Sequence, residues 1–325
     1  MSHDGTQAEV TKGGGFAFLA AGYGGPQVIR QELSDVRALL EIPAADPLPV
    51  GVAYFGWKFE EPGHPVEDML NAALEARVRA IWLSFGRDLG RWVEHTRRRV
   101  RDAGLIDNTL IFVLVNSLDE AMLAINEWKA DVIVAQGIEA GGHGSNYAPP
   151  TFSLVSSILE KTPGNRPPII AAGGLSNGSQ VAAYLTLGAS GAVLGTRFLL
   201  TPESPYTDGQ KNALLSASAD LSVRTLAFDH ARNTLGWPEG IDGRGLRNEI
   251  VKDFDAGVDI SNLREKVQEA VKSGNPGYMV TWAGLGVGDM TEIKPAKAII
   301  RQLHEQIKES LQASALLISA NGNDA

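Results

Sequence analysis

Short apolar runs alternate with amphipathic stretches from residue 16 to residue 199, and this alternation is the clearest pattern in the chain. Seven runs lack polar alternation and predict buried strands: Phe16–Ala21, Val50–Phe55, Ala80–Phe85, Leu110–Val115, Val132–Ala135, Ile169–Ala172 and Ala192–Phe198. Stretches with helical spacing between them include Val66–Arg77, Arg91–Ala103, Leu118–Lys129 and Ser179–Leu187. Each strand and the helix after it make one βα unit, so the pattern predicts a parallel sheet covered by helices on both faces.

Two α/β architectures fit this repeat, a TIM (β/α)8-type barrel and a doubly wound open sheet. The repeat is uniform, and glycine turns suited to a phosphate follow the last two strands, which is where barrels place phosphate. Gly13-Gly14-Gly15 precedes a strand, whereas the dinucleotide-binding fingerprint follows the first strand. The pattern therefore favours a barrel, with residues 1–325 in a single domain.

The predicted barrel is one strand short, because seven strands are found where eight are needed. Residues 7–12 read as the end of a helix leading into the Phe16 strand, so the chain is expected to open inside a first βα unit without its strand. Such a gap leaves two unpaired strand edges. Either a strand upstream of this sequence fills it or another segment does, and the apolar tail Ala313–Ala320 is one candidate.

The βα rhythm stops after residue 200. Residues 201–290 are rich in Gly, Pro, Asn and Asp and contain a helix-like stretch at Tyr206–Ala219. We interpret this region as a lid or cap inserted before the final barrel helix, which the apolar spacing places at Ile293–Leu311.

Composition narrows the function classes. The formal net charge of −9 argues against a non-specific nucleic-acid binder, which needs a basic face. The chain has no cysteine, so disulfides, thiolate metal sites and thiol nucleophiles are excluded, and no His/Asp/Glu spacing suggests a metal. Without a signal-peptide core or a membrane-length apolar run, the expectation is a soluble cytoplasmic protein that binds no membrane.

His143 is the candidate acid/base group. It follows the Val132 strand in a turn with glycines at 141, 142 and 144, which allow close approach of the backbone to a ligand. A neutral imidazole there could remove a proton from a weak carbon acid near pH 7. The alternative is a structural or surface histidine.

Gln136 ends the same strand, and either its amide satisfies buried backbone groups or it faces the polar edge of a planar heterocycle. Aromatic residues near strand ends could wall an apolar pocket against a flavin ring, or could simply pack at the rim. They are Tyr54, Phe55, Trp57 and Trp282.

Two glycine turns follow consecutive strands. The stretch Gly173–Gly178 leads into a helix, and its backbone N–H groups with the positive helix end suit a phosphate. Ser176 or Asn177 can serve simply as the helix cap. Gly195-Thr196 repeats the arrangement one strand later and adds a hydroxyl donor. Together the two turns predict a phosphate held between them.

These segments resemble the nitronate monooxygenase family, formerly called 2-nitropropane dioxygenases, which are FMN-dependent TIM barrels. The resemblance spans about residues 8–310, and its motifs occur in family order. They are Gly14-Gly15-Phe16 through Gly22, Ala135-Gln136-Gly137 with Glu139-Ala140-Gly141-Gly142-His143-Gly144, Ile170–Gly174, and Leu194-Gly195-Thr196-Arg197-Phe198.

The resemblance implies that FMN is the cofactor, with Gln136 and Gly141 in contact with it. Gly174 and the segment Val193-Leu194-Gly195-Thr196 would hold its phosphate. His143 would deprotonate a nitroalkane or position its nitronate anion. The implied reaction consumes O2 and converts the substrate to a carbonyl compound and nitrite.

The chain departs from the family pattern at two places. The usual opening strand ending in Ala-Pro-Met is missing, and no asparagine stands at the end of the Val50–Phe55 strand. One flavin contact is therefore in doubt.

Two other functions stay open. A flavin-dependent enoyl-acyl-carrier-protein reductase shares the barrel and much of the motif set. A truncated, non-catalytic barrel is the second. The physiological substrate, the use of NAD(P)H and the oligomeric state do not follow from the sequence.

Overall fold

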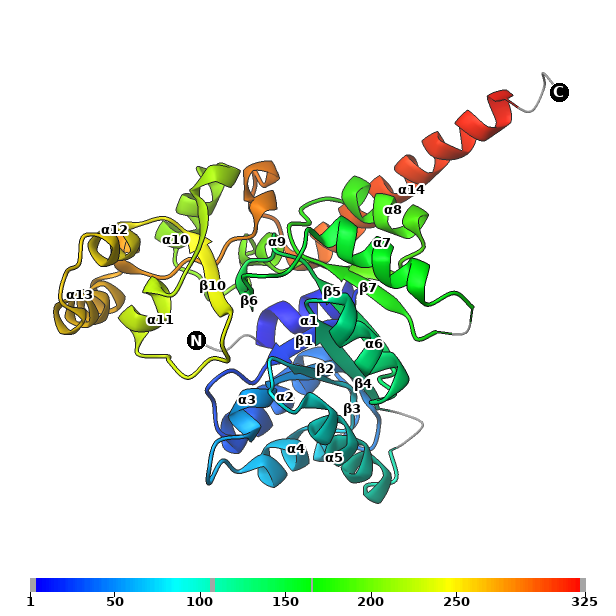
Figure 1. Cartoon of the computed structure of the whole chain (residues 1–325), viewed down its shortest axis with the longest axis horizontal. Helices are drawn as coiled ribbons and strands as arrows, with labels where there is room; N and C mark the ends of the chain where they lie inside the picture. The colour runs from blue at the N-terminus through cyan, green and yellow to red at the C-terminus, as the bar shows by residue number, and fades with distance from the viewer. Residues whose placement is uncertain (1–3, 106–108, 165, 322–325) are drawn as a thin grey trace.

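The computed structural model describes residues 4–105, 109–164 and 166–321. Its larger sheet has seven parallel strands in the order β1-β2-β3-β4-β5-β7-β8 (Figure 1). These strands are β1 (Ala17–Ala20), β2 (Leu48–Phe55), β3 (Val78–Ser84), β4 (Leu110–Val115), β5 (Val132–Gln136), β7 (Ile169–Ala172) and β8 (Gly191–Val193). The order confirms the predicted barrel of βα units, since each strand pairs with the next parallel strand along the chain.

The last predicted strand, Ala192–Phe198, is shorter in the structure. Strand β8 ends at Val193, and the short helix α9 (Thr196–Leu199) begins almost at once. Gly195 makes this change of direction with φ −100° and ψ −67°, which is outside the extended region. The glycine turn therefore interrupts the apolar run that suggested a longer strand.

Helices surround the sheet on its outer side (Figure 1). They are α1 (Asp4–Lys12), α2 (Pro26–Leu40), α3 (Gly56–Phe59), α4 (Val66–Glu75), α5 (Leu89–Asp102), α6 (Leu118–Asn126), α7 (Thr151–Lys161), α8 (Gly178–Leu187) and α14 (Ala296–Asn321). The core between the two layers consists of aliphatic side chains that are essentially inaccessible, such as Leu33, Val52 and Ile81. Their burial is the main source of stability for this fold.

The seven-stranded sheet is open, with β1 and β8 at its two edges. Within the described residues, no ladder joins β1 to β8, which confirms the predicted missing strand. Helix α14 packs against both α8 and α1, across the position of the gap. Ala313–Ala320 lies within this helix, so it does not fill the gap and this candidate for the missing strand is excluded. The tail continues α14 without a break, and its alanine and leucine residues favour a helix.

Aromatic side chains occupy the interior of the open barrel. Phe18 packs edge to face against Trp82 and Phe112, with ring centroids 4.9 and 5.1 Å apart. Gly51 makes room for this cluster, because a Cβ there would lie 2.3 Å from the Phe18 ring. Phe16 remains 47% exposed beside the free edge of β1. The missing strand thus leaves apolar interior surface accessible.

Residues 201–290 form a lobe beside the barrel, drawn in yellow and orange in Figure 1. It contains α10 (Asp208–Leu215), α11 (Ala227–Arg232), α12 (Glu249–Asp255) and α13 (Ile260–Ser273), with short 3-10 turns at Ala219–Leu221, Pro276–Tyr278 and Leu285–Asp289. Helix α10 is shorter than the predicted Tyr206–Ala219 at both ends, and Thr207 caps its start in a capping box with Gln210. Phe228, Ile250 and Leu263 form part of a separate small core in this lobe.

A second sheet ties the lobe to the barrel. It has three antiparallel strands in the order β6-β10-β9, namely β6 (Gly142–Ser145), β9 (Ser222–Thr225) and β10 (Ile241–Leu246). Strand β6 leaves the carboxyl end of β5, and His143 pairs with Gly243 of β10. The glycines of residues 137–144 predict a turn rather than strand β6, and no local pattern predicts β9 or β10. No helix in the described part of the chain is long and apolar enough to cross a membrane.

Candidate functional site

A cavity of about 110 Å³ opens at the carboxyl ends of the barrel strands. Residues at or just after the ends of β3, β4, β5, β7 and β8 line it, together with the segment 284–290. Sites for whole drug-sized ligands usually measure about 300–1,000 Å³. This cavity therefore has room for one end of a cofactor, such as a phosphate group.

Six of the residues predicted to bind the cofactor line this single cavity: Gln136, Gly141, Gly174, Val193, Gly195 and Thr196. Leu194 does not, because its side chain packs against the barrel core. His143 also lies outside the lining, but the Gln136 side chain reaches it, with Nε2 donating to the His143 carbonyl oxygen at 3.3 Å. The structure thus brings the two predicted glycine turns together and sets the histidine next to them.

Four glycine segments meet at the cavity, one more than predicted: they contain Gly141, Gly173-Gly174, Gly195 and Gly284–Gly286. A Cβ on Gly141 would lie 2.5 Å from the Gly284 nitrogen, and one on Gly286 would lie 2.2 Å from the Gly174 oxygen. Gly174 also has a φ of +72°, which glycine adopts without strain. The unpredicted segment, Gly284-Leu285-Gly286, lies near the end of residues 201–290 in the sequence. Its glycine spacing was visible in the sequence, but it follows no predicted strand.

The cavity offers backbone donors rather than charged side chains. In the described part of the chain, the N–H groups of Gly174 and Gly195 have no hydrogen-bond acceptor. The Thr196 hydroxyl accepts the Gly284 N–H at 3.0 Å and keeps its own proton to donate. Unpaired N–H groups in such a concave turn are suited to binding an anion. A phosphate fits this donor set.

Asn116 is a site residue that the sequence analysis missed. It directly follows β4, is 5% exposed, and donates to the Gln136 carbonyl at 2.8 Å and to its Oε1 at 3.0 Å. Asn116 and the His143 carbonyl therefore occupy both ends of the Gln136 amide. This network supports the structural interpretation of Gln136, although the residue also lines the cavity. The signal was present, because an asparagine at the carboxyl end of a barrel strand stands where functional side chains gather.

The Glu120 carboxylate accepts a hydrogen bond from Asn116, and its protonation makes the free energy of unfolding depend on pH. Oε2 accepts the Asn116 backbone N–H at 2.6 Å, while burial raises the pKa of Glu120. A carboxyl group whose pKa is higher in the folded than in the unfolded state stabilises the fold fully at pH values below the unfolded-state pKa. This contribution is lost as pH rises through the folded-state pKa. We expect the free energy of unfolding of Glu120→Gln, minus that of the parent, to increase as pH rises from about 4 to 7. Urea unfolding across that range measures this, and a constant difference would contradict it.

His143 is fixed on one edge and one face. Its Nε2 lies 3.0 Å from both carboxylate oxygens of Asp229, a residue of α11 that is 0% exposed. The indole of Trp237 stacks on the imidazole with ring centroids 3.7 Å apart and 10° between the planes. Trp282 lies 5.2 Å away at 60°. Neither Asp229 nor Trp237 was identified from the sequence, since both lie in the lobe, far from His143 along the chain.

The predicted aromatic residues divide into two groups. Phe55 and Trp57 pack against Trp237, with centroids 4.8 and 5.2 Å apart, so they lie close to His143. Tyr54 points the other way. It is 1% exposed and its hydroxyl donates to the Met69 carbonyl at 2.7 Å, so it belongs to the core between β2 and α4. The alternation of side chains along a strand explains the difference.

Two arginines from the lobe hold the loop that carries His143. The Arg224 guanidinium donates to the carbonyls of Ala140 and Gly144 at 3.0 and 2.9 Å and pairs with Asp242 at 2.9 Å. Arg244 donates to the Ile138 carbonyl at 3.2 Å, and burial lowers its pKa. Buried guanidinium groups that bond several carbonyls fix a loop firmly. The lobe therefore positions residues 138–144 on the barrel.

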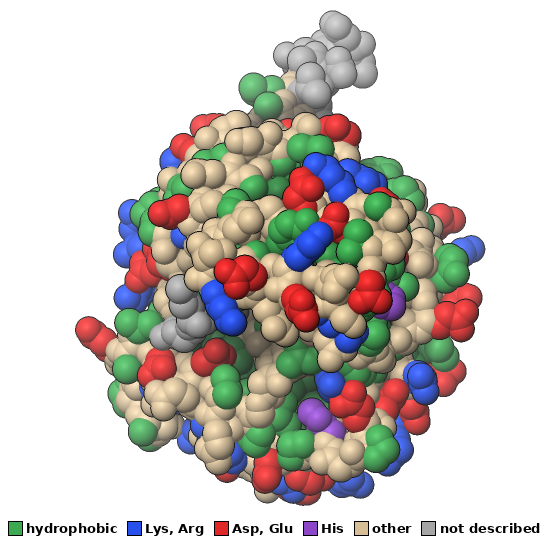
Figure 2. Space-filling model, turned by 90° about the vertical axis from the view of Figure 1, so that its left-hand side faces the viewer, with side chains coloured by type: hydrophobic (Ala, Val, Ile, Leu, Met, Phe, Trp, Pro, Cys, Tyr) green, Lys and Arg blue, Asp and Glu red, His purple; other side chains and the backbone are tan. Residues whose placement is uncertain are grey.

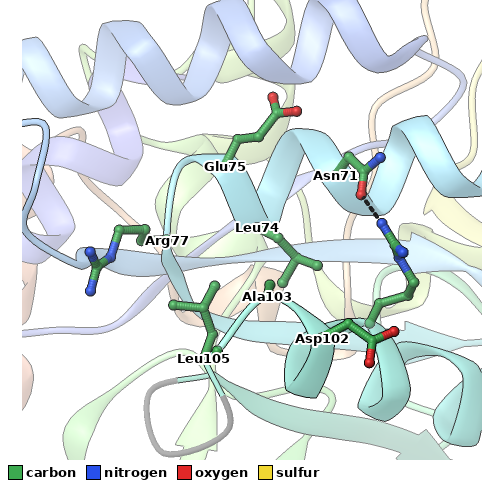
Figure 3. A pocket seen from close by; sticks show the side chains of 9 residues that line it. Asn71, Leu74, Glu75, Arg77, Asp102, Ala103 and Leu105 are labelled. Atoms are coloured by element: carbon green, nitrogen blue, oxygen red, sulfur yellow. Dashed lines mark hydrogen bonds between the residues drawn. The ribbon is translucent and has the colours of Figure 1, made fainter.

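A larger cavity of about 400 Å³ lies at the other end of the barrel, between α4 and α5 (Figure 3). Leu74 and Leu105 line it, both on segments that precede strands, and the Arg99 guanidinium bonds Asn71 across it. Barrel enzymes place their chemistry at the carboxyl ends of the strands, whereas this end contributes to stability. We therefore assign the function to the smaller cavity.

The chain is similar to known proteins over most of its length. A family model described as nitronate monooxygenase matches residues 60–306. A protein of Metarhizium robertsii named nitronate monooxygenase npaC is 31% identical, over 96% of this chain and 89% of its own length. Among solved structures, a nitroalkane oxidase from Streptomyces ansochromogenes has a TM-score of 0.76 and 26% identity, covering 95% of this chain and 93% of that one. FabK from Thermotoga maritima has a TM-score of 0.74 and 25% identity, covering 96% and 91%.

Proposed function

The chain belongs to the nitronate monooxygenase family, and on that premise we propose that it binds FMN at the carboxyl end of its barrel. There it would oxidise nitroalkanes or their nitronates with O2, releasing a carbonyl compound and nitrite. The observation that carries the proposal is the meeting of six predicted cofactor residues around one cavity, with His143 joined to that cavity through Gln136.

The phosphate of FMN is proposed to lie between the two glycine turns. The N–H groups of Gly174 and Gly195 and the Thr196 hydroxyl are the available donors. Gly141 would let the backbone approach the cofactor closely. Gln136 would offer the ring the second Nε2 hydrogen or the second Oε1 lone pair, which Asn116 and the His143 carbonyl leave unused. When bound, the flavin supplies an acceptor for the electrons that leave the substrate.

His143 is proposed as the group that takes the proton of a carbon acid. Its ring stands against Trp237 and Asp229, so both its position and its orientation are set before the substrate arrives. Residues 201–290 would then act as a lid, because this lobe supplies both neighbours and exclusion of water strengthens electrostatic interactions in a site.

Two assays test the proposal. The purified protein, supplied with FMN and desalted, should keep a bound-flavin absorption spectrum. It should then consume O2 and release nitrite when given nitroethane or its nitronate. A protein that stays colourless would indicate a barrel that binds no flavin. A coloured protein that acts on neither substrate would contradict the proposed reaction.

NAD(P)H distinguishes this function from that of a flavin-dependent enoyl reductase. Anaerobic reduction of the flavin by NAD(P)H, followed by turnover of an enoyl thioester, would support the reductase. That activity needs a basic surface for an acidic carrier protein, and on the face shown in Figure 2 lysine and arginine side chains are interspersed with acidic ones. We expect no such turnover.

A further inference from the structure

We infer that Asp229 and His143 act as one unit, in which Asp229 is the positioning residue that makes His143 a base for a neutral nitroalkane. This inference rests on the proposed function and specifies its substrate class as the protonated carbon acid. It concerns a residue of the lobe that no sequence motif marks.

Asp229 and His143 form a buried pair with close contacts. Both Asp229 oxygens lie 3.0 Å from His143 Nε2, and the Asp229 side chain is 1% exposed. The Thr234 hydroxyl donates to Oδ1 at 2.8 Å. A buried carboxylate is costly unless its partners are in place, and here two donors are present. The pair is therefore a built arrangement rather than a chance surface contact.

The contact with Asp229 determines which ring nitrogen of His143 is basic. A carboxylate only accepts hydrogen bonds, so Nε2 must carry the proton of the neutral ring. The lone pair is then on Nδ1, for which the described residues provide no hydrogen-bond partner. Asp229 therefore selects the tautomer whose free nitrogen can accept a substrate proton.

The surrounding residues hold the His143 ring in one orientation. Trp237 covers one face of the ring, and the Trp282 indole lies against it at 60°. The Trp282 backbone N–H donates to the Tyr206 hydroxyl at 2.9 Å, which anchors that side. Pairing of His143 with Gly243 fixes the backbone. The imidazole cannot turn without breaking these contacts, so the Nδ1 edge keeps one direction.

The proton transfer balances without another reactant. The C–H bond next to the nitro group breaks, its electron pair stays on the substrate as the nitronate, and the proton forms a bond to Nδ1. The imidazolium then faces the Asp229 carboxylate, which stabilises it and takes no proton. A substrate supplied as the nitronate has already lost this proton, so it does not need the pair.

The test compares these two forms of one substrate in Asp229→Asn. For nitroethane we expect kcat/KM to fall about 10²–10⁴-fold, the range for loss of an effective general base. For the preformed nitronate we expect less than about a tenfold change. Equal losses on both forms, or no loss on either, would overturn the inference. Activity of the parent on neither form would instead reject the proposed function.

A second readout does not depend on activity. The chain has six histidines, so ¹⁵N imidazole spectra at pH 8 can be assigned by comparison with His143→Ala. We expect the Nε2–H tautomer in the parent and the Nδ1–H tautomer in Asp229→Asn, whose amide can donate to Nε2. An Nδ1–H tautomer in the parent would overturn the inference whatever the rates show.

Three further variants distinguish loss of the Asp229–His143 pair from loss of folding. Asp255→Asn removes a carboxylate of an exposed pair with Arg247 in the same lobe, and should behave as the parent in both readouts. Thr234→Val removes the hydroxyl donor to Asp229, and Thr234→Ser restores it. We expect Thr234→Val to lower nitroethane turnover about tenfold and Thr234→Ser to turn over nitroethane as the parent does. Turnover of the nitronate should be unchanged in both variants. Failure of Ser to recover activity would count against the pair.

Discussion

His143→Ala is expected to lower kcat/KM for nitroethane by about 10²–10⁴-fold while leaving the flavin spectrum intact. The imidazole is the group proposed to take the substrate proton, and its side chain is not part of the cavity lining. Loss of the ring should therefore remove the base and spare the cofactor. Nitrite release with flavin-loaded protein measures the first effect, and the absorption spectrum after desalting measures the second.

His304→Ala is the matched control, since this histidine is exposed on α14 and does not line the cavity. It should retain full activity. Unchanged nitroethane turnover in His143→Ala would reject the base assignment. The double variant His143→Ala/Asp229→Asn should be no slower than His143→Ala alone, because residues that act as a unit are strongly non-additive. A further large loss in the double variant would mean that Asp229 acts independently of the histidine.

The barrel could be predicted because its strands are buried on both faces. Runs such as Leu110–Val115 and Ile169–Ala172 have no polar alternation, and the structure gives both with the predicted bounds. The second sheet could not be predicted in this way. Strand β10 reads Ile-Asp-Gly-Arg-Gly-Leu, which has little intrinsic strand preference, and it forms because β6 and β9 pair with it on both sides.

The candidate site could likewise be predicted only in part from the sequence. Gly174 and Gly195 could be paired in advance, because each follows a strand and neighbouring barrel strands end at the same rim. Asp229 could not be assigned, since it is 86 residues from His143 and lies on a six-residue helix in the lobe. Contacts between the barrel and the lobe depend on how the second sheet joins them, and local sequence carries no signal for that.

Gly195→Val is expected to weaken FMN binding by two to four orders of magnitude without unfolding the protein. A Cβ at this position meets no heavy atom within 4 Å, and the backbone φ of −100° suits any L-residue. Because Gly195 lines the cavity, the added isopropyl group would take space that the phosphate needs. Loss of two charge-assisted hydrogen bonds, worth about 1.5–3 kcal/mol each, corresponds to that change in affinity.

Gly191→Val separates the cavity from the general effect of adding a side chain. Gly191 also has open space at its Cβ position and lies four residues earlier on β8, but it does not line the cavity. FMN titration should therefore give a much larger Kd for Gly195→Val than for Gly191→Val, at similar thermal midpoints without cofactor. Equal affinity in both variants and the parent would place the phosphate elsewhere. Equal loss in both would mean that β8 as a whole responds to a side chain, so that the two glycine turns need not form the cradle.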